Sequence, residues 1–140
     1  MAKSRRSLSF LTVLACAATM GCGQPSAPSG GALCGARIAR EWRGKTPNVK
    51  ADEYAAYLAD SIKKFRTIKG NIGYQMMRET IGDETHFAVI SYWESRDAIK
   101  AYAGEDIRRT RVAPRDPEFI IDPELTVMNY DVTGTDFGCK

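Results

Sequence analysis

The sequence predicts an α+β fold in which two helices cover one face of a four-stranded antiparallel sheet. Three observations predict it. Residues 87–93 form an almost unbroken apolar run, rich in aromatic and β-branched residues and short enough for a buried strand. A helical pattern follows this run at once, and a turn signal of two residues precedes it. A second helical pattern lies earlier in the chain, between two further strand-like segments.

The first half of the domain has the pattern of a strand, a turn and a helix. Residues 37–43 alternate in part between apolar and charged side chains, which predicts a strand. Residues 44–48 are expected to turn, and Asn48 can cap a helix over residues 49–65. That helix carries one apolar stripe, which consists of Tyr54, Tyr57, Leu58, Ile62 and Phe65.

The Gly82-Asp83 pair fits a two-residue hairpin turn between a strand over residues 72–81 and the central strand. Such a turn fixes the register, because each residue then has one partner across the hairpin. One face is expected to carry the pairs Ile72 and Trp93, Tyr74 and Ser91, Met76 and Val89, and Arg78 and Phe87. The other face is expected to carry Gly73 and Tyr92, Gln75 and Ile90, Met77 and Ala88, and Glu79 and His86.

After the central strand, Ser95 can cap a helix whose apolar positions recur at spacings of three and four, and Gly104 can end it. A polar stretch with three prolines follows, then a last strand over residues 125–132 and a tail over residues 134–140. The order strand, helix, strand, strand, helix, strand is the ferredoxin-like arrangement, with the first and third strands at the centre of the sheet. The folded domain is expected over residues 35–133.

The first 22 residues have the features of an export signal. A positively charged start precedes an apolar segment that is too short to span a bilayer as a helix. Residues 19–24 resemble a bacterial lipoprotein signal, in which Cys22 would be acylated and would anchor the chain to a membrane. Residues 23–34 would then be a flexible linker rich in Pro, Gly and Ser. We expect an exported protein, either a membrane-anchored lipoprotein or a periplasmic or secreted one.

The charge balance argues against nucleic acid as a partner. The chain has 20 Lys and Arg residues against 17 Asp and Glu residues. Three of the cations lie in the signal, so 17 cations and 17 acids remain. Nucleic-acid capture needs a basic surface, which this balance does not provide. A group of arginines in the second half is interleaved with acids, so a solvated surface of mixed charge is expected at Arg108, Arg109, Arg111 and Arg115.

Cys34 and Cys139 lie at the two ends of the folded region. The ferredoxin-like topology places the first and last strands side by side, which brings these ends together. In an oxidising compartment the pair is therefore a disulfide candidate. We expect no metal site, because no second ligand lies near either cysteine and the only histidine is His86.

Two motifs resemble the antibiotic biosynthesis monooxygenase (ABM) family, which belongs to the dimeric α/β-barrel superfamily. Residues 70–78 read Gly-Asn-x-Gly followed by an apolar run, and residues 87–99 contain Phe-x-Val-x-x-x-Trp-Glu-Ser-x-x-Ala. The resemblance covers residues 36–132. It implies a homodimer whose two sheets enclose a pocket. It also implies activities that range from cofactor-free oxygenation of electron-rich aromatics to haem degradation.

Two helices can cover only one face of a four-stranded sheet, so the other face needs a partner. Guided by the resemblance, we expect the face with the larger side chains to look into the shared barrel. Left to water, those side chains would expose a patch of the size that marks an interface or a ligand site. They are Phe87, Val89, Met76, Tyr74 and Trp93.

Six residues are candidates for ligand binding. By the resemblance, Trp93 matches a tryptophan that shapes the site of haem-degrading relatives, although packing explains it as well. The hydroxyls of Tyr74 and Ser91 could bind a ligand or simply satisfy each other, and Arg78 could meet an anionic substrate. The full set is Trp93, Tyr74, Ser91, Phe87, Arg78 and Trp42.

The catalytic residues are not identified by the sequence, and two weak candidates stand out. Asn129 could orient a carbonyl or a dioxygen-derived group, and His86 could act as a base. Haem-degrading relatives carry an axial histidine on the helix after the third strand, and residues 96–115 contain none. Relatives also often carry histidine where this chain has Arg43 and Asn129, which weakens the case for catalysis.

Two functions therefore remain open. The first is cofactor-free oxidation of a small electron-rich aromatic, in which a dry apolar pocket and a few oriented dipoles support electron transfer to O2. No cofactor is expected, since the sequence has no glycine-rich phosphate loop and no cluster of metal ligands. The second is a non-catalytic envelope lipoprotein that binds a small hydrophobic ligand or a protein partner.

Overall fold

The computed structural model describes residues 33–136. The expected export signal, most of the expected linker, Cys22 and Cys139 lie outside these residues. Cys34 lies inside them, so its pairing with Cys139 stays a prediction. None of the helices between residues 33 and 136 combines the length and the apolar character that a membrane crossing requires.

Within the described residues, four strands form one sheet and three α-helices lie outside it. The strands are β1 (Ile38–Pro47), β2 (Asn71–Ile81), β3 (Glu84–Trp93) and β4 (Met128–Asp131). The helices are α1 (Ala51–Lys63), α2 (Arg96–Ala103) and α3 (Asp116–Phe119), and two 3-10 turns flank α1 at η2 (Asn48–Lys50) and η3 (Lys64–Thr67). The sheet order is β2-β3-β1-β4, and all neighbouring strands are antiparallel. This arrangement confirms the predicted ferredoxin-like fold.

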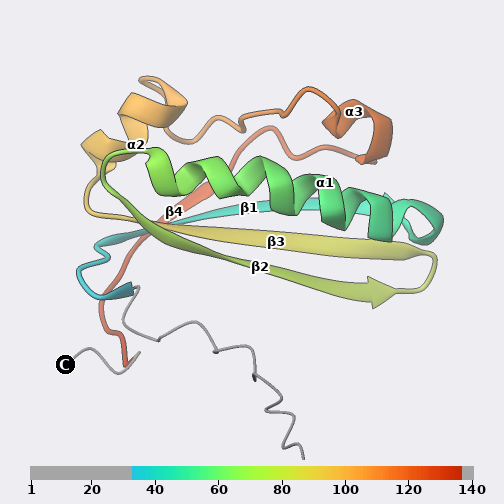
Figure 1. Ribbon diagram of the computed structural model, residues 1–140, viewed down its shortest axis with the longest axis horizontal. Helices are drawn as coiled ribbons and strands as arrows, with labels where there is room; N and C mark the ends of the chain where they lie inside the picture. Colours follow the sequence, from blue (N-terminus) through green and yellow to red (C-terminus); the bar gives the residue numbers. More distant parts are fainter. Residues whose placement is uncertain (1–32, 137–140) are drawn as a thin grey trace, which may run out of the picture.

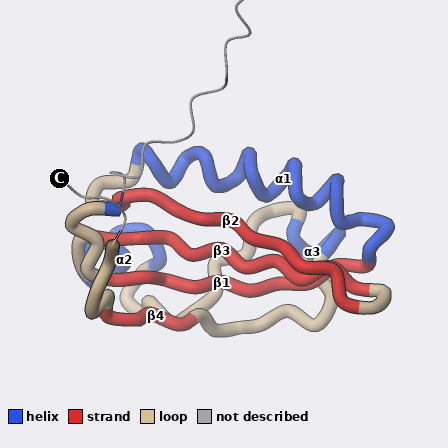
Figure 2. Tube along the Cα trace, turned by 90° about the horizontal axis from the view of Figure 1, so that it is seen from below, coloured by secondary structure: helices blue, strands red, loops and turns tan. Residues whose placement is uncertain are grey.

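The helices all lie on one side of the sheet, as Figure 1 shows. Figure 2 shows the opposite side, on which no helix lies within the described residues. We call the two sides the helix face and the open face. On β3 the helix face carries Thr85, Phe87, Val89, Ser91 and Trp93, and the open face carries the residues between them.

The hairpin register is confirmed along most of its length. Tyr74 pairs with Ser91, Met76 with Val89, and Arg78 with Phe87, as the two-residue turn requires. The register shifts between Asn71 and Gly73, where a bulge places Asn71 rather than Ile72 opposite Trp93. The cap of α2 is also confirmed, because the backbone N–H of Ala98 donates to Ser95 Oγ at 3.1 Å. Gly104 ends that helix with a φ of 91°, a conformation that favours glycine.

Three element predictions were wrong in their bounds. The expected turn over residues 44–48 is strand up to Pro47, because Gly44–Pro47 pair with β3. Asn48 does not cap α1; its side chain donates to Gly82 O at 2.9 Å and accepts from Thr85 Oγ1 at 2.8 Å. The helix begins at Ala51 and the last strand spans Met128–Asp131 alone. The polar stretch with prolines contains α3, which the sequence analysis did not anticipate.

The assignment of the two sheet faces was also wrong. Phe87 is 2% exposed and lies beneath α1, against Tyr54, Leu58 and Ile62, and Val89 belongs to the same cluster. Tyr54 meets Phe87 edge to face, with ring centroids 5.1 Å apart. The larger apolar face is therefore buried within one chain, because the apolar stripe of α1 needs apolar partners as much as the sheet does.

Candidate functional site

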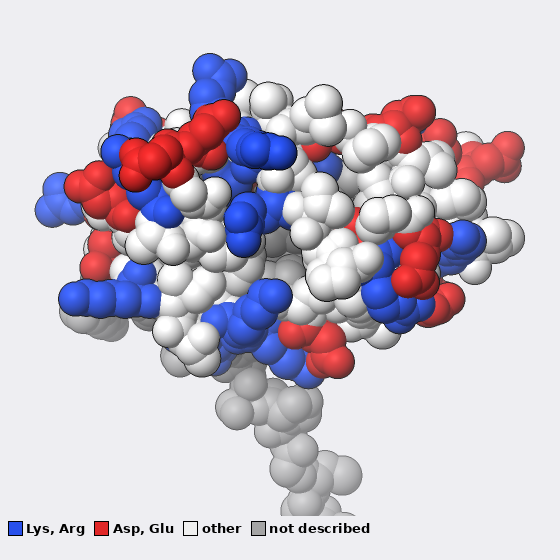
Figure 3. All heavy atoms as spheres, turned by 90° about the horizontal axis from the view of Figure 1, so that it is seen from above, with Lys and Arg blue, Asp and Glu red and all other residues white. Residues whose placement is uncertain are grey.

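A cavity of about 290 Å³ lies on the helix face, between the sheet, α1 and the segment that joins α2 to β4. Figure 3 shows this side of the molecule, hollowed near its centre, with Lys and Arg atoms beside the hollow. Most of the lining is apolar. The apolar lining includes Trp42, Leu58, Ile62, Phe65, Val89, Val112 and Val127.

Trp42 reaches the cavity from β1, and the glycine two positions later makes room for it. A Cβ atom at Gly44 would lie 2.5 Å from Trp42 Cη2 and 3.0 Å from Ile120 Cδ1. The indole thus lies across the space that a side chain at position 44 would occupy. Because both residues lie on the helix face of β1, the absence of a side chain at Gly44 sets the position of this wall.

An aromatic cluster closes the cavity at the end where α1 runs into η3. Phe65 and Tyr102 line the cavity, with ring centroids 5.0 Å apart. Trp93 stacks on Tyr102 at 5.5 Å and is fully buried behind the wall. Its Nε1–H donates to Ser91 Oγ at 2.9 Å, and Ser91 in turn donates to the backbone carbonyl of Arg40 at 3.3 Å. The tryptophan therefore fixes the hydroxyl of Ser91 on the cavity wall.

Asp116 is the one acidic side chain in the cavity lining. It is 7% exposed, and both of its oxygens accept a hydrogen bond. Tyr54 donates its hydroxyl to Oδ1 at 3.2 Å, and the backbone N–H of Ala113 donates to Oδ2 at 2.6 Å. Burial raises the pKa of Asp116, although these two hydrogen bonds work in the opposite direction. A carboxylate has about four lone-pair sites, so Asp116 can still accept a proton or a hydrogen bond from a ligand.

Three cationic side chains also line the cavity: Arg40 from β1, Lys64 from η3 and Arg111 from the segment after α2. Arg40 is 5% exposed, and its guanidinium donates only to neutral acceptors, the carbonyls of Ile107 and Arg109 and Oδ1 of Asn129. Burial lowers the pKa of Arg40, and the neighbouring charge of Arg111 lowers it further. The cavity therefore contains more positive than negative charge.

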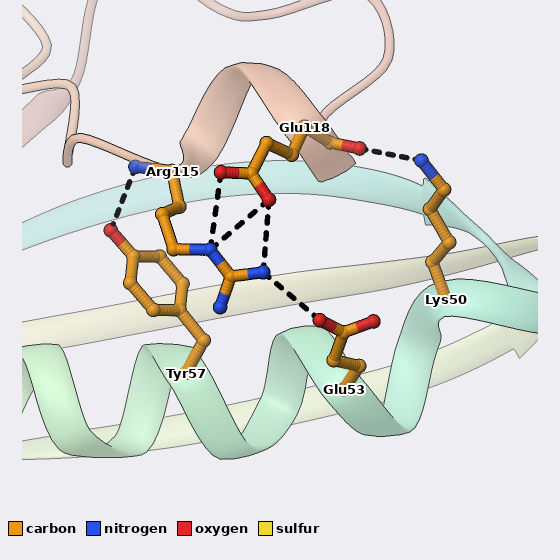
Figure 4. A network of polar contacts seen from close by, with 5 residues as sticks. All are labelled: Lys50, Glu53, Tyr57, Arg115 and Glu118. Atoms are coloured by element: carbon orange, nitrogen blue, oxygen red, sulfur yellow. Dashed lines mark hydrogen bonds and ion pairs between the residues drawn. The ribbon is translucent and has the colours of Figure 1, made fainter.

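A polar network ties α3, beside the cavity, to α1 (Figure 4). The Arg115 guanidinium donates to both oxygens of Glu118 and, at 3.0 Å, to Glu53 on α1. The backbone N–H of Arg115 donates to the hydroxyl of Tyr57 at 3.1 Å, and Lys50 donates to the carbonyl of Glu118. These contacts hold the start of α3, and with it Asp116, against the helix.

The predicted ligand-binding residues are divided by the structure. Trp42 and Ser91 line the cavity, and Trp93 stands directly behind it. Tyr74 packs edge to face on Phe65 at 6.5 Å and is not part of the lining. Phe87 and Arg78 border a second depression, between α1 and the edge strand β2, where Arg78 forms an ion pair with Asp52 at 2.7 Å.

The two weak catalytic candidates lie outside the cavity. Asn129 accepts from Arg40 at 3.4 Å and donates to the carbonyl of Ile107 at 3.1 Å, so it positions Arg40. His86 lies on the open face of β3, with Nε2 3.4 Å from Glu84 Oε2. Neither side chain lines the cavity.

Sequence analysis missed the charged residues of the cavity. Arg40 alternates with Ile38 and Trp42 in β1, and this spacing places all three on one face of the strand. An arginine on an apolar face was the signal that could have marked it. Asp116 and Arg111 carry no such signal, because they lie in a stretch of mixed charge whose burial depends on tertiary packing.

Comparison with known proteins agrees with the fold. Residues 43–111 match the family model described as antibiotic biosynthesis monooxygenase (ABM). No curated protein sequence matches the chain. A protein of unknown function from Nitrosomonas europaea has a similar structure, with a TM-score of 0.56 at 11% identity over 72% of this chain and 93% of that chain.

Two further solved structures are similar at low identity. A putative antibiotic biosynthesis monooxygenase from Bacillus cereus gives a TM-score of 0.51 at 12% identity, over 72% of this chain and 97% of that chain. The haem-degrader MhuD from Mycobacterium tuberculosis, solved with two haems in its active site, gives a TM-score of 0.50 at 19% identity, over 71% of this chain and 98% of that chain. At these identities the similarity shows the fold alone. The match to the family model is confined to residues 43–111, just under half of the chain.

Proposed function

We propose that this domain oxidises a small electron-rich aromatic molecule with O2, without a cofactor, in the cavity between the sheet and α1. The size of the cavity supports a ligand of one or two rings. An apolar cavity of about 150 Å³ can hold benzene, and this one measures about 290 Å³. Its aromatic and aliphatic walls suit a flat apolar ring, and its few polar groups can orient it.

Haem fits this cavity poorly. A porphyrin with four pyrrole rings is much larger than a two-ring aromatic, for which the volume is adequate. The only histidine of the chain, His86, lies on the open face of the sheet and does not line the cavity. We therefore propose no haem chemistry for this chain.

The chemistry begins with removal of a proton, and Asp116 is the group placed to accept it. Its raised pKa makes it a better base than an ordinary carboxylate, and Tyr54 and the Ala113 amide hold it in place. The resulting phenolate gives one electron to O2, and the phenoxyl radical and superoxide combine into a C–O bond at a ring carbon that bears hydrogen. Asp116 returns its proton to the peroxide anion that this step forms, which gives a hydroperoxide. Loss of water from this hydroperoxide leaves a quinone, so that phenol and O2 yield quinone and water.

The buried carboxylate on the cavity wall is the observation that carries the proposal, and its replacement tests it. 1,5-Dihydroxynaphthalene, in which the carbon para to each hydroxyl bears hydrogen, is supplied with ¹⁸O2, and oxygen uptake is measured above the background without protein. One labelled oxygen is expected in the product quinone. Asp116→Asn keeps the shape of the side chain and removes the base, so the rate should fall by roughly 100-fold or more. The exposed Asp122→Asn is the matched control and should leave the rate unchanged.

A non-catalytic binding role is the alternative, and one observation favours it. Both oxygens of Asp116 already accept hydrogen bonds within the chain, which is also what a purely structural turn requires. Binding of the aromatic probe without oxygen uptake or label incorporation would support this role and reject the oxygenase.

We also propose that the chain is exported, acylated at Cys22 and closed by a disulfide between Cys34 and Cys139. The support is the apolar signal and the position of the two cysteines at the ends of the domain. Mass spectrometry of the mature protein tests both parts. A mature chain that begins before residue 22 and carries no acyl group would reject acylation at Cys22. Free thiols at Cys34 and Cys139 under non-reducing conditions would reject the disulfide.

A homodimer through the open face completes the proposal. This face carries half-exposed apolar side chains, including Met77 and, on β4, Met128 and Tyr130. Polar pairs are also present on it, such as Arg43 with Glu41 at 2.9 Å. A sheet face with such a composition can be covered by a second copy of the chain, and the resemblance to a dimeric superfamily supports that occupant.

A further inference from the structure

The three cations of the cavity are not held by a direct ion pair within the described residues. Among residues 33–136, neither Arg40, Lys64 nor Arg111 forms an ion pair. The acid that shares the cavity, Asp116, accepts instead from Tyr54 and Ala113. Arg115, on the same side of the sheet but outside the cavity lining, is by contrast paired with Glu53 and Glu118. Three of the cations without an ion pair therefore line one cavity.

Arg40 is the most unusual of the three, because a buried charge is costly unless it is paired. Two of its bonds leave Nη1 and one leaves Nη2. A guanidinium has five N–H donors, so two of them have no acceptor in the described part of the chain. Since Arg40 lines the cavity, these donors are available to a bound molecule.

Arg111 is an electrostatic neighbour of Arg40, and Lys64 lines the same cavity from η3. The guanidinium of Arg111 lies over the ring of Tyr102, 6.0 Å from its centroid, and Lys64 neighbours Phe65 in η3. Phe65 and Tyr102 are themselves in contact, so the residues that flank Arg111 and Lys64 meet at one end of the cavity. Figure 3 shows Lys and Arg atoms around the hollow. Asp116 instead contacts Tyr54, in the first turn of α1.

We infer that the cavity binds an aromatic carboxylate, whose anionic group lies among Arg40, Arg111 and Lys64 while its ring fills the apolar part. A carboxylate matches the donor fork of a guanidinium and would supply the missing counter-charge. A single carboxylated ring also suits a cavity of about 290 Å³. This inference rests on the proposed function, in that it takes the cavity to be the ligand site, and it names the class of ligand.

The test compares 4-hydroxybenzoate with its neutral analogue 4-hydroxybenzamide, by isothermal titration with the whole chain. The carboxylate is expected to bind at least tenfold more tightly, as charge-assisted hydrogen bonds require. Arg111→Gln and Lys64→Gln should each weaken binding of the carboxylate about five- to tenfold and leave binding of the amide unchanged. Both side chains are exposed enough to be replaced without loss of the fold. Arg108→Gln, an exposed arginine of the same segment outside the cavity lining, is the matched control and should change neither affinity.

Three results would overturn the inference. Equal affinities for the two probes would show that the cations do not select an anion, and the cavity would still stand as an aromatic site. Equal losses in Arg111→Gln and Arg108→Gln would show general charge attraction rather than a site. Binding of neither probe, nor of the dihydroxynaphthalene, would reject the proposed function together with the inference.

Discussion

The helix face and the open face of the sheet are built from alternate residues of the same strands, yet they differ in kind. The helix face buries Phe87, Val89 and Trp93 and holds the cavity. The open face carries smaller or more polar residues, such as Ala88 and His86. Polar side chains of neighbouring strands also form hydrogen bonds across this face. In one of these hydrogen bonds, the hydroxyl of Tyr92 donates to Oε1 of Gln75 at 2.9 Å. The more apolar face is thus covered within the chain, and the more mixed face has no helix over it among the described residues.

This difference is the reason why the proposed ligand site is placed on the helix face. A covered face can enclose a cavity, exclude water and hold Arg40 and Asp116 in a setting where their charges have strong effects. The open face of one chain cannot do so, because its polar groups are exposed to solvent. Function is therefore expected on the helix face and association on the open face.

The largest expected effect is a difference in the free energy of unfolding between a substitution on the helix face and one on the open face. Phe87→Ala removes a buried ring from beneath α1 and should lower the free energy of unfolding by about 3–5 kcal/mol. Met77→Ala, on the neighbouring strand of the same hairpin, removes a side chain that is 45% exposed and should cost under about 1 kcal/mol. Urea denaturation at low protein concentration measures both. Equal losses would mean that the two faces are buried alike.

The second prediction concerns association. Met77→Glu places a charge on the open face and should convert the proposed dimer into a folded monomer, as seen by light scattering and circular dichroism. Val49→Glu changes an apolar side chain that is 94% exposed in η2, away from the sheet, and should leave the dimer intact. A wild-type chain that is monomeric, or a Met77→Glu chain that is still dimeric, contradicts association through this face.

The smallest expected effect is a pH dependence that belongs to the helix face. Folding raises the pKa of Asp116, chiefly through burial. The stability that this group contributes is therefore full below its unfolded pKa and is lost as pH rises through the folded pKa. In urea denaturation, the difference in stability between the wild type and Asp116→Asn should move in favour of the wild type as the pH is lowered. A difference that is constant with pH would show that the carboxyl group is not desolvated.

Much of the fold could be predicted from local patterns. The Gly82-Asp83 turn set the hairpin register from Tyr74 to Ile81, because a two-residue turn leaves no freedom in pairing. The cap at Ser95 and the end of α2 at Gly104 could also be predicted, because each depends only on residues close by in the sequence. The limits of β1 were not, since Gly44 and Pro47 suggest a turn and are held as strand only by pairing with β3.

The site was predicted in part. Trp42 and Ser91 were found because strand alternation shows which residues share a face, and they line the cavity. The cover over that face was assigned to a second chain, whereas α1 of the same chain provides it. Asp116 was not found, since its burial depends on Tyr54, far away in the sequence.

The sequence by itself determined the order of the elements, the hairpin register and the sets of side chains that share each face, because these depend on neighbours along the chain and on the two-residue period of a strand. Only the tertiary structure decided which set the helices cover. The right-handed crossover connections decide on which side of the sheet the helices lie, and the pleat decides which residues point to that side. Both are fixed only when segments that are distant in the sequence pack together. The same packing brought Arg40, Arg111 and Asp116 to one cavity.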